Sequence, residues 1–72
     1  MKTIKKAVMV RFENYYSRIE RQLVIGTIDR GKAIRSVKDF QCNRKVEVKE
    51  CIILKDVNPC EIDFDIDYAI NL

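Results

Sequence analysis

Alternating carboxylates near the end of the chain, at Asp63, Asp65 and Asp67, have the residue type and regular spacing that suggest a metal site. Alternate residues of a strand stand roughly 6.6–7 Å apart, whereas two oxygens on one calcium ion lie within about 5 Å of each other. The glycine that an EF-hand loop requires is also absent from this stretch. We therefore predict no metal site here, and expect these acids to pair across strands with Lys5 and Arg11.

Three cysteines recur at regular intervals, at Cys42, Cys51 and Cys60. Structural zinc normally needs four ligands, often in close pairs, and the sequence contains no histidine to complete a set. An odd number of cysteines without a visible signal peptide is not typical of a secreted disulfide scaffold. We predict reduced, semi-buried thiols in a cytosolic protein, with no bound metal.

Catalysis finds little support in the residue types. Without histidine there is no imidazole for acid–base chemistry, and the cysteines have no evident activating base. Gly26 and Gly31 do not form a phosphate-cradling loop. No apolar run approaches the roughly 20 residues that a membrane span requires. We expect a protein that is not an enzyme, needs no cofactor and does not contact a membrane.

The 72 residues allow one small domain, which we expect to span residues 1–72. Apolar residues make up 47% and charged residues 35%, a mixture typical of a folded protein rather than a disordered tail. Lysine and arginine number 14 against 11 acids, which gives a formal net charge of +3. The excess of bases lies in the first half of the chain.

That basic half raises nucleic-acid binding as an alternative function. Two tyrosines, Tyr15 and Tyr16, precede a series of bases that could contact phosphates while the rings stack on nucleotides: Arg18, Arg21, Arg30, Lys32 and Arg35. The isoelectric point of about 8.9 is modest, however, and the acids of the last segment would repel a nucleic-acid backbone. Elimination therefore favours a module that binds another protein.

The elements that position these residues begin with two strands. Residues 3–12 alternate between apolar and polar, with Val8, Val10 and Phe12 on the side that faces the core. Residues 18–28 alternate in the same way, and residues 13–17 between them have turn-forming character. We predict an antiparallel hairpin.

A longer period follows the hairpin. Asp29 is typical of a helix N-cap, and apolar residues from Ala33 onward recur at spacings of three and four. We predict a helix over residues 30–54, although residues 46–54 also alternate and are rich in β-branched side chains. Asn58-Pro59 ends any helix, because proline disfavours helical geometry in the preceding residue.

Residues 60–72 alternate between apolar and polar side chains, which predicts a strand with one buried face. The chain is therefore expected to be α+β, in the order β-β-α-β. Placing the last strand beside the first gives a three-stranded antiparallel sheet of order 2-1-3, with one long amphipathic helix on one face.

Three stretches of the chain match a known pattern: residues 8–14 (VMVRFEN), residues 52–56 (IILKD) and the tetrad Cys60-Glu61-Ile62-Asp63. With the order of the predicted elements, they resemble the Dmd antitoxin family of T-even-type bacteriophages. The resemblance implies a phage protein in the host cytoplasm that neutralises the RNA-cleaving toxins RnlA or LsoA by direct contact. Such an inhibitor wedges into a groove of the toxin, obstructs RNA access and keeps late phage mRNA intact.

The resemblance also implies contacts on the helix, where the family has a tryptophan and, further along, an asparagine. This chain has no tryptophan. The corresponding positions are Ile34 or Arg35 and then Asn43, with Arg44 as the alternative register, and Lys38 shares the helix surface. We expect these residues to bind the partner; the alternative is a solvated charged face. Self-association stays open.

Overall fold

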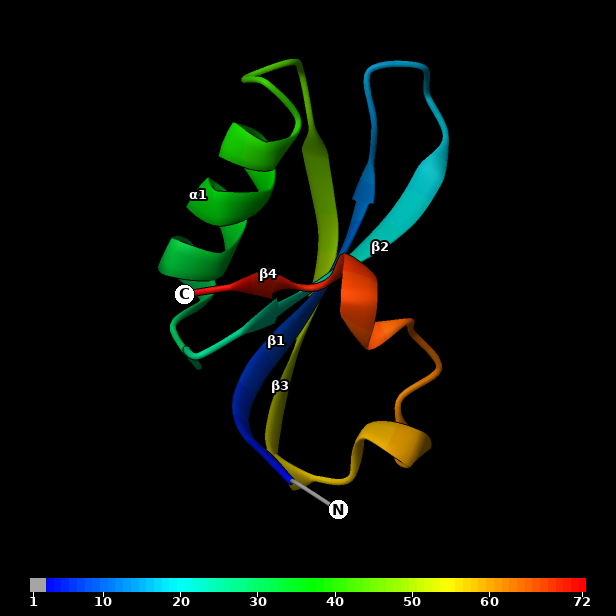
Figure 1. Ribbon diagram of the computed structural model, residues 1–72. Coiled ribbons are helices and arrows are strands. Elements are labelled where there is room, and N and C mark those ends of the chain that lie inside the picture. Colours follow the sequence, from blue (N-terminus) through cyan, green and yellow to red (C-terminus); the bar gives the residue numbers. More distant parts are fainter. Residues whose placement is uncertain (1–2) are drawn as a thin grey trace.

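The computed structural model describes residues 3–72, so Met1 and Lys2 of the predicted 1–72 domain lie outside the described residues. Three long strands, one helix and a short last strand make up the regular structure (Figure 1): β1 (Ile4–Glu13), β2 (Ile19–Ile25), α1 (Arg30–Phe40), β3 (Glu47–Val57) and β4 (Ile70–Asn71). Two short 3₁₀ helices, η1 (Pro59–Glu61) and η2 (Ile66–Tyr68), lie between β3 and β4.

The described strands form one mixed sheet of four strands in the order β3-β1-β2-β4. β1 pairs antiparallel with both β2 and β3, whereas β4 pairs parallel with the end of β2. The α+β class and the β1–β2 hairpin are therefore confirmed. The predicted three-stranded sheet of order 2-1-3 is wrong, because β3 occupies the place beside β1 that the prediction gave to residues 60–72.

α1 begins at the predicted residue but ends well before the predicted end at residue 54. The Asp29 carboxylate accepts a hydrogen bond of 3.1 Å from the Lys32 amide, which confirms it as the N-cap. The helix ends at Phe40 instead of continuing to residue 54, because Cys42 and Asn43 adopt left-handed φ angles of 58° and 57° that reverse the chain.

The alternation in residues 46–54, rather than the helical period, determines the structure there. β-branched side chains lose rotamer freedom in a helix and pack well on a pleated surface. As part of β3 this stretch pairs with β1 through main-chain hydrogen bonds. In that pairing Ala7, Val8 and Met9 stand opposite Leu54, Ile53 and Ile52. One register shift interrupts the pairing, between Arg11 and Phe12.

Residues 60–72 are not the predicted strand. The Asn58 side chain accepts a hydrogen bond from the Cys60 amide, and the Asp65 side chain accepts one from the Asp67 amide, each at 3.0 Å. Such local bonds favour turns over a strand ladder. The alternation of apolar and polar residues still determines which side chains are buried. The acids are exposed, while Ile62 and Phe64 are half-buried against the sheet.

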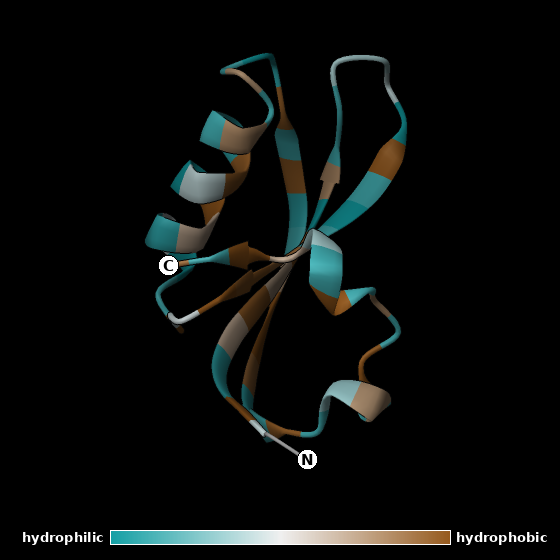
Figure 2. Cartoon of the chain, viewed as in Figure 1, coloured by the Kyte–Doolittle hydropathy of each residue, from teal (hydrophilic) through white to brown (hydrophobic). Residues whose placement is uncertain are grey.

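The sheet is covered on both faces, so the molecule has two apolar clusters. On one face α1 packs through Ala33 and Val37 on buried residues of β1 and β2: Val8, Val10, Phe12 and Val24. On the other face residues 59–69, here called the covering segment, pack on Ile4, Ala7, Met9 and Leu23. Figure 2 shows hydrophobic colouring along the strands between these covers and hydrophilic colouring on the outward turns of α1.

Polar contacts join the covering segment to β2 rather than to β1. The Arg21 guanidinium donates to the Asp63 carbonyl and lies 3.8 Å from its carboxylate, and buried Gln22 donates to the Tyr68 carbonyl at 2.8 Å. The predicted pairing of Asp63, Asp65 and Asp67 with Lys5 and Arg11 is therefore wrong. Arg11 instead lies 3.9 Å from Glu50 on β3, the strand that took the neighbouring position.

Gly26 ends β2 at a point where no other residue fits. Its φ of 105° is strained for any side chain. The chain end also approaches it closely, since the Leu72 amide donates to the Ile25 carbonyl at 2.9 Å. A Cβ atom at Gly26 would lie 2.9 Å from the Leu72 carbonyl oxygen, which is backbone and cannot rotate away.

We expect Gly26→Ala to lower the free energy of unfolding by about 1–2 kcal/mol or more, because it adds backbone strain and a collision with Leu72. In a domain of this size that is a fall in Tm of roughly 4–16 °C, measurable by thermal denaturation. Gly31→Ala is the comparison and should cost less, because Gly31 has no left-handed φ and a Cβ there would meet a side-chain oxygen of Asp29, at 3.2 Å, rather than backbone. Equal Tm values for Gly26→Ala and the wild type would contradict the assigned geometry.

Candidate functional site

A groove of about 730 Å³ lies at the end of the sheet where the β1–β2 loop approaches the α1–β3 connection. We call it the tip groove; it is lined by polar and aromatic residues of these two segments and of the start of β2: Asn14, Tyr15, Tyr16, Arg18, Glu20, Gln41 and Arg44. Tyr15 and Tyr16 are 62% and 68% exposed, which is high for such large side chains. Exposed aromatic residues in a rigid hollow are typical of a recognition surface.

Asn14 fixes the β1–β2 loop from its first position. Its side-chain oxygen accepts hydrogen bonds from the Tyr16 and Arg18 amides at 2.9 and 3.0 Å, and its side-chain amide donates to Glu20 at 2.6 Å. Its main-chain N–H donates to the Arg18 carbonyl and its carbonyl accepts from the Ser17 amide. With Ser17 in a left-handed conformation, the loop presents both tyrosines from one defined backbone.

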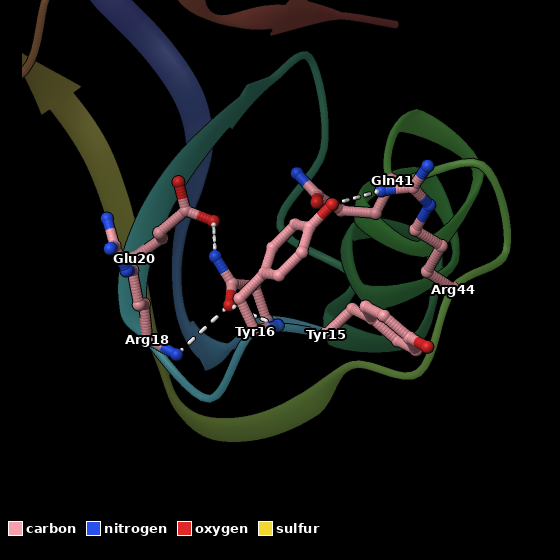
Figure 3. A pocket seen from close by; sticks show the side chains of 7 residues that line it. Tyr15, Tyr16, Arg18, Glu20, Gln41 and Arg44 are labelled. Atoms are coloured by element: carbon pink, nitrogen blue, oxygen red, sulfur yellow. Dashed lines mark hydrogen bonds between the residues drawn. The ribbon is translucent and has the colours of Figure 1, made fainter.

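Arg44 reaches the tyrosines from the other segment. Its Nη1 donates to the Tyr16 hydroxyl at 3.3 Å, and its guanidinium carbon lies 5.9 Å from the centre of the Tyr15 ring, within range of a cation–π interaction. The two rings meet edge to face, with centroids 5.4 Å apart. Figure 3 shows Tyr16 extending from the loop toward Arg44 and Gln41.

The chemistry of the tip groove is that of binding rather than bond making. The guanidinium groups of Arg18 and Arg44 are suited to carboxylates or phosphates, and the tyrosine rings to flat or apolar groups. Among the described residues that line it, Glu20 is the carboxylate, and Asn14 already donates to it. Lys45 adds a third base in a second hollow of about 210 Å³, which Tyr15 and the carboxylates of Glu13 and Glu47 also line.

Of the residues predicted to bind a partner, the structure brings Arg44 into the tip groove. Asn43 is exposed in the turn just before it, with its amide bonded to the Lys38 carbonyl at 2.9 Å. Arg35 and Lys38 are exposed on α1, and Ile34 is half-buried there. These four therefore adjoin the groove along the chain without lining it.

The basic residues of the alternative function are divided among several places. Arg18 joins Tyr15 and Tyr16 in the tip groove, whereas Arg21 contacts the covering segment. Three others, Arg30, Lys32 and Arg35, lie on α1 before the turn. Three residues of the groove, Asn14, Glu20 and Gln41, were not among the predicted site residues; the available signal for Asn14 was its position at the start of a polar turn.

The cysteines differ in their surroundings, so the prediction of three semi-buried thiols is wrong for two of them. Cys42 and Cys60 are exposed, whereas Cys51 is half-buried against the apolar cluster beneath α1. Burial raises the pKa of the Cys51 thiol; nearby Arg30 lowers it and Glu50 raises it by smaller amounts.

We expect iodoacetamide to alkylate Cys51 several-fold more slowly than Cys42 in the folded protein at mildly alkaline pH. The reactive form is the thiolate, and a raised pKa leaves less of it at any pH below that pKa. Peptide mass spectrometry at timed intervals gives both rates. In urea the rates should converge, and equal rates in the folded protein would contradict the burial of Cys51.

The rest of the described structure offers neither a metal site nor a membrane-spanning helix. Within residues 3–72, no group of three or more cysteine and acidic side chains is arranged to hold a metal ion. No helix in the same part of the chain is both long and apolar enough to span a membrane. No protein-family model, curated protein or solved structure matches the chain.

Proposed function

We propose that the protein is a phage antitoxin that acts in the host cytoplasm by binding a host endoribonuclease toxin of the RnlA/LsoA type and blocking its access to mRNA. The observation that carries the proposal is the exposed and fixed cluster of Tyr15, Tyr16 and Arg44. Tyrosine and arginine are enriched among the residues that dominate protein–protein binding energies. The choice of an RNase toxin as the partner is supported by the resemblance of three stretches of the chain to the Dmd family.

This cluster would bind with little ordering cost. Association normally costs about 0.5–1.5 kcal/mol for each flexible side chain that becomes immobilised. Here Asn14 already holds the loop, and Arg44 already contacts both rings. A protein that acts by obstruction needs no chemistry of its own, so we propose neither enzymatic activity nor a cofactor.

The helix residues expected from the resemblance extend the same surface. Asn43 directly precedes Arg44, and its amide is bonded to the carbonyl of Lys38. Arg35 lies one helical turn before Lys38. The proposed contact surface therefore runs from the outer side of α1, across the turn at Asn43, to the two tyrosines.

We expect Tyr16→Ala and Arg44→Ala each to weaken toxin binding by about 2 kcal/mol, or roughly 30-fold in Kd, because both remove a preorganised anchor. The measurement is calorimetric titration with purified RnlA and with LsoA, combined with survival of toxin-expressing cells. Tyr68→Ala is the matched control, since Tyr68 is also an exposed tyrosine, 71% exposed, but belongs to the covering segment. Normal binding by both groove variants, with a loss in Tyr68→Ala, would move the contact elsewhere.

On the helix side, Arg35→Ala and Asn43→Gly should each weaken toxin binding while leaving Tm nearly unchanged. Glycine is the informative replacement at Asn43, because alanine at a φ of 57° would add backbone strain that glycine avoids. If the single variants and the double variant bind and protect cells like the wild type, this part of the surface is only a solvated charged face.

Nucleic-acid binding is the second candidate function, and one observation favours it: Arg18 and Arg44 line the tip groove with Tyr15 and Tyr16, and Lys45 lines the neighbouring hollow with Tyr15. Bases stack on such rings, while the cations contact phosphates. A short single-stranded oligouridylate is the probe. Binding that weakens steeply between about 50 and 200 mM salt, together with no binding to either toxin, would favour this function over the antitoxin.

A further inference from the structure

β3 has an open edge up to Lys55, beyond which Asp56 leaves the regular strand conformation with a left-handed φ of 51°. It is an outer strand of the sheet, with β1 as its only neighbour among the described residues, and it spans Glu47–Val57. An open edge presents unpaired amide and carbonyl groups to any extended chain that approaches it.

The hydrogen-bond pattern identifies which groups on this edge are available. The Gly26 amide donates to the Lys6 carbonyl, and antiparallel strands alternate the direction of successive residues. Residues 7, 9 and 11 of β1 therefore direct their main-chain groups toward β3, where they stand opposite Leu54, Ile52 and Glu50. The main-chain groups that point outward from β3 are consequently those of Cys51, Ile53 and Lys55.

The middle of this edge lacks the usual protection against pairing. Residues 51–54 are apolar, with no proline or charge between Glu50 and Lys55. Ile52 and Ile53 point to opposite faces of the sheet and remain 46% and 38% exposed. An incoming strand would cover apolar side chains on both faces as well as the open backbone groups.

A second copy of the chain is poorly matched to this edge. If two β3 strands paired antiparallel about a two-fold axis, facing side chains would have to lie on the same side of the sheet. One residue at the centre of the pair would then face the same residue of the other copy. Centring on Ile52 sets Lys49 against Lys55. Centring on Ile53 sets Cys51 against Lys55 and places Glu50 opposite Asp56, where the left-handed φ of 51° also interrupts the regular strand. Centring on Cys51 avoids like charges but sets Glu50 against Ile52, so the isoleucines gain no apolar partner.

We infer that the open edge of β3 receives an extended segment of the toxin, which adds a strand to the sheet. The segment would be apolar at its centre, opposite Ile52 and Ile53, with acidic residues facing Lys49 or Lys55 and a basic residue facing Glu50. This inference rests on the proposed function and names how its partner docks.

The decisive measurement is amide hydrogen exchange, resolved by residue, on the wild-type protein alone and with purified RnlA or LsoA. On binding, exchange at the outward amides of Cys51, Ile53 and Lys55 should slow by at least about tenfold and approach that of the Ile52 and Leu54 amides, which are bonded to β1 and slow only through stabilisation of the whole domain. Binding without slower exchange at the three outward amides overturns the inference and leaves the antitoxin function standing. Failure to bind either toxin overturns both. Slower exchange that depends on the concentration of the chain alone assigns the edge to a second copy instead.

A pair of variants tests the same edge independently. Ile53→Pro removes an outward N–H that makes no bond within the sheet, a position where edge strands tolerate proline. Ile53→Ala removes the side chain and keeps the N–H. We expect Ile53→Pro to weaken toxin binding at least about tenfold more than Ile53→Ala, with both proteins folded by circular dichroism. Equal affinities of the two variants would show that the Ile53 amide is not used.

Discussion

β1 is buried on both faces, and the other elements are arranged around that constraint. Ala7, Val8, Met9 and Val10 are consecutive residues and all are buried, so neither face of the central strand can be left to water. β2 and β3 form hydrogen bonds with its main-chain groups, and α1 and the covering segment bury its side chains. At about 25 cal/mol per Å² of apolar surface, losing either cover would remove a large part of the stability of so small a domain.

The hairpin and the start of the helix were predictable because their signals are local. The alternation of apolar and polar residues around Val8 and the capping side chain of Asp29 each determine the structure of residues only a few positions away. The later elements could not be predicted in this way, because two segments compete for the place beside β1 and no local pattern decides between them. Residues 46–54 and residues 60–72 both alternate, and the place beside β1 accepts only one of them. Asn58 and Asp65 bond to amides of their own segment, which favoured turns there and left the place to β3.

The tip groove could be predicted only in part, for the same reason. Tyr15, Tyr16 and Arg18 are neighbours in sequence and stood out as a group. Arg44 was expected on a continuous helix, and its contact with Tyr16 depends on the reversal at Cys42 and Asn43. Once the helix ends at Phe40, the turn that follows must cross the end of the sheet, and its first long basic side chain meets the hairpin loop.

The contact of Arg44 with the two tyrosines joins segments that are 28 residues apart in the chain. The hairpin alone contains the rings and the loop that holds them, but the complete groove exists only when β3 is paired with β1. Any molecule that prefers the complete groove therefore also prefers the paired sheet, and its binding adds to the free energy of unfolding of the whole domain. A ligand bound in the groove would thus also stabilise the opposite end of the sheet against unfolding, without any change of shape.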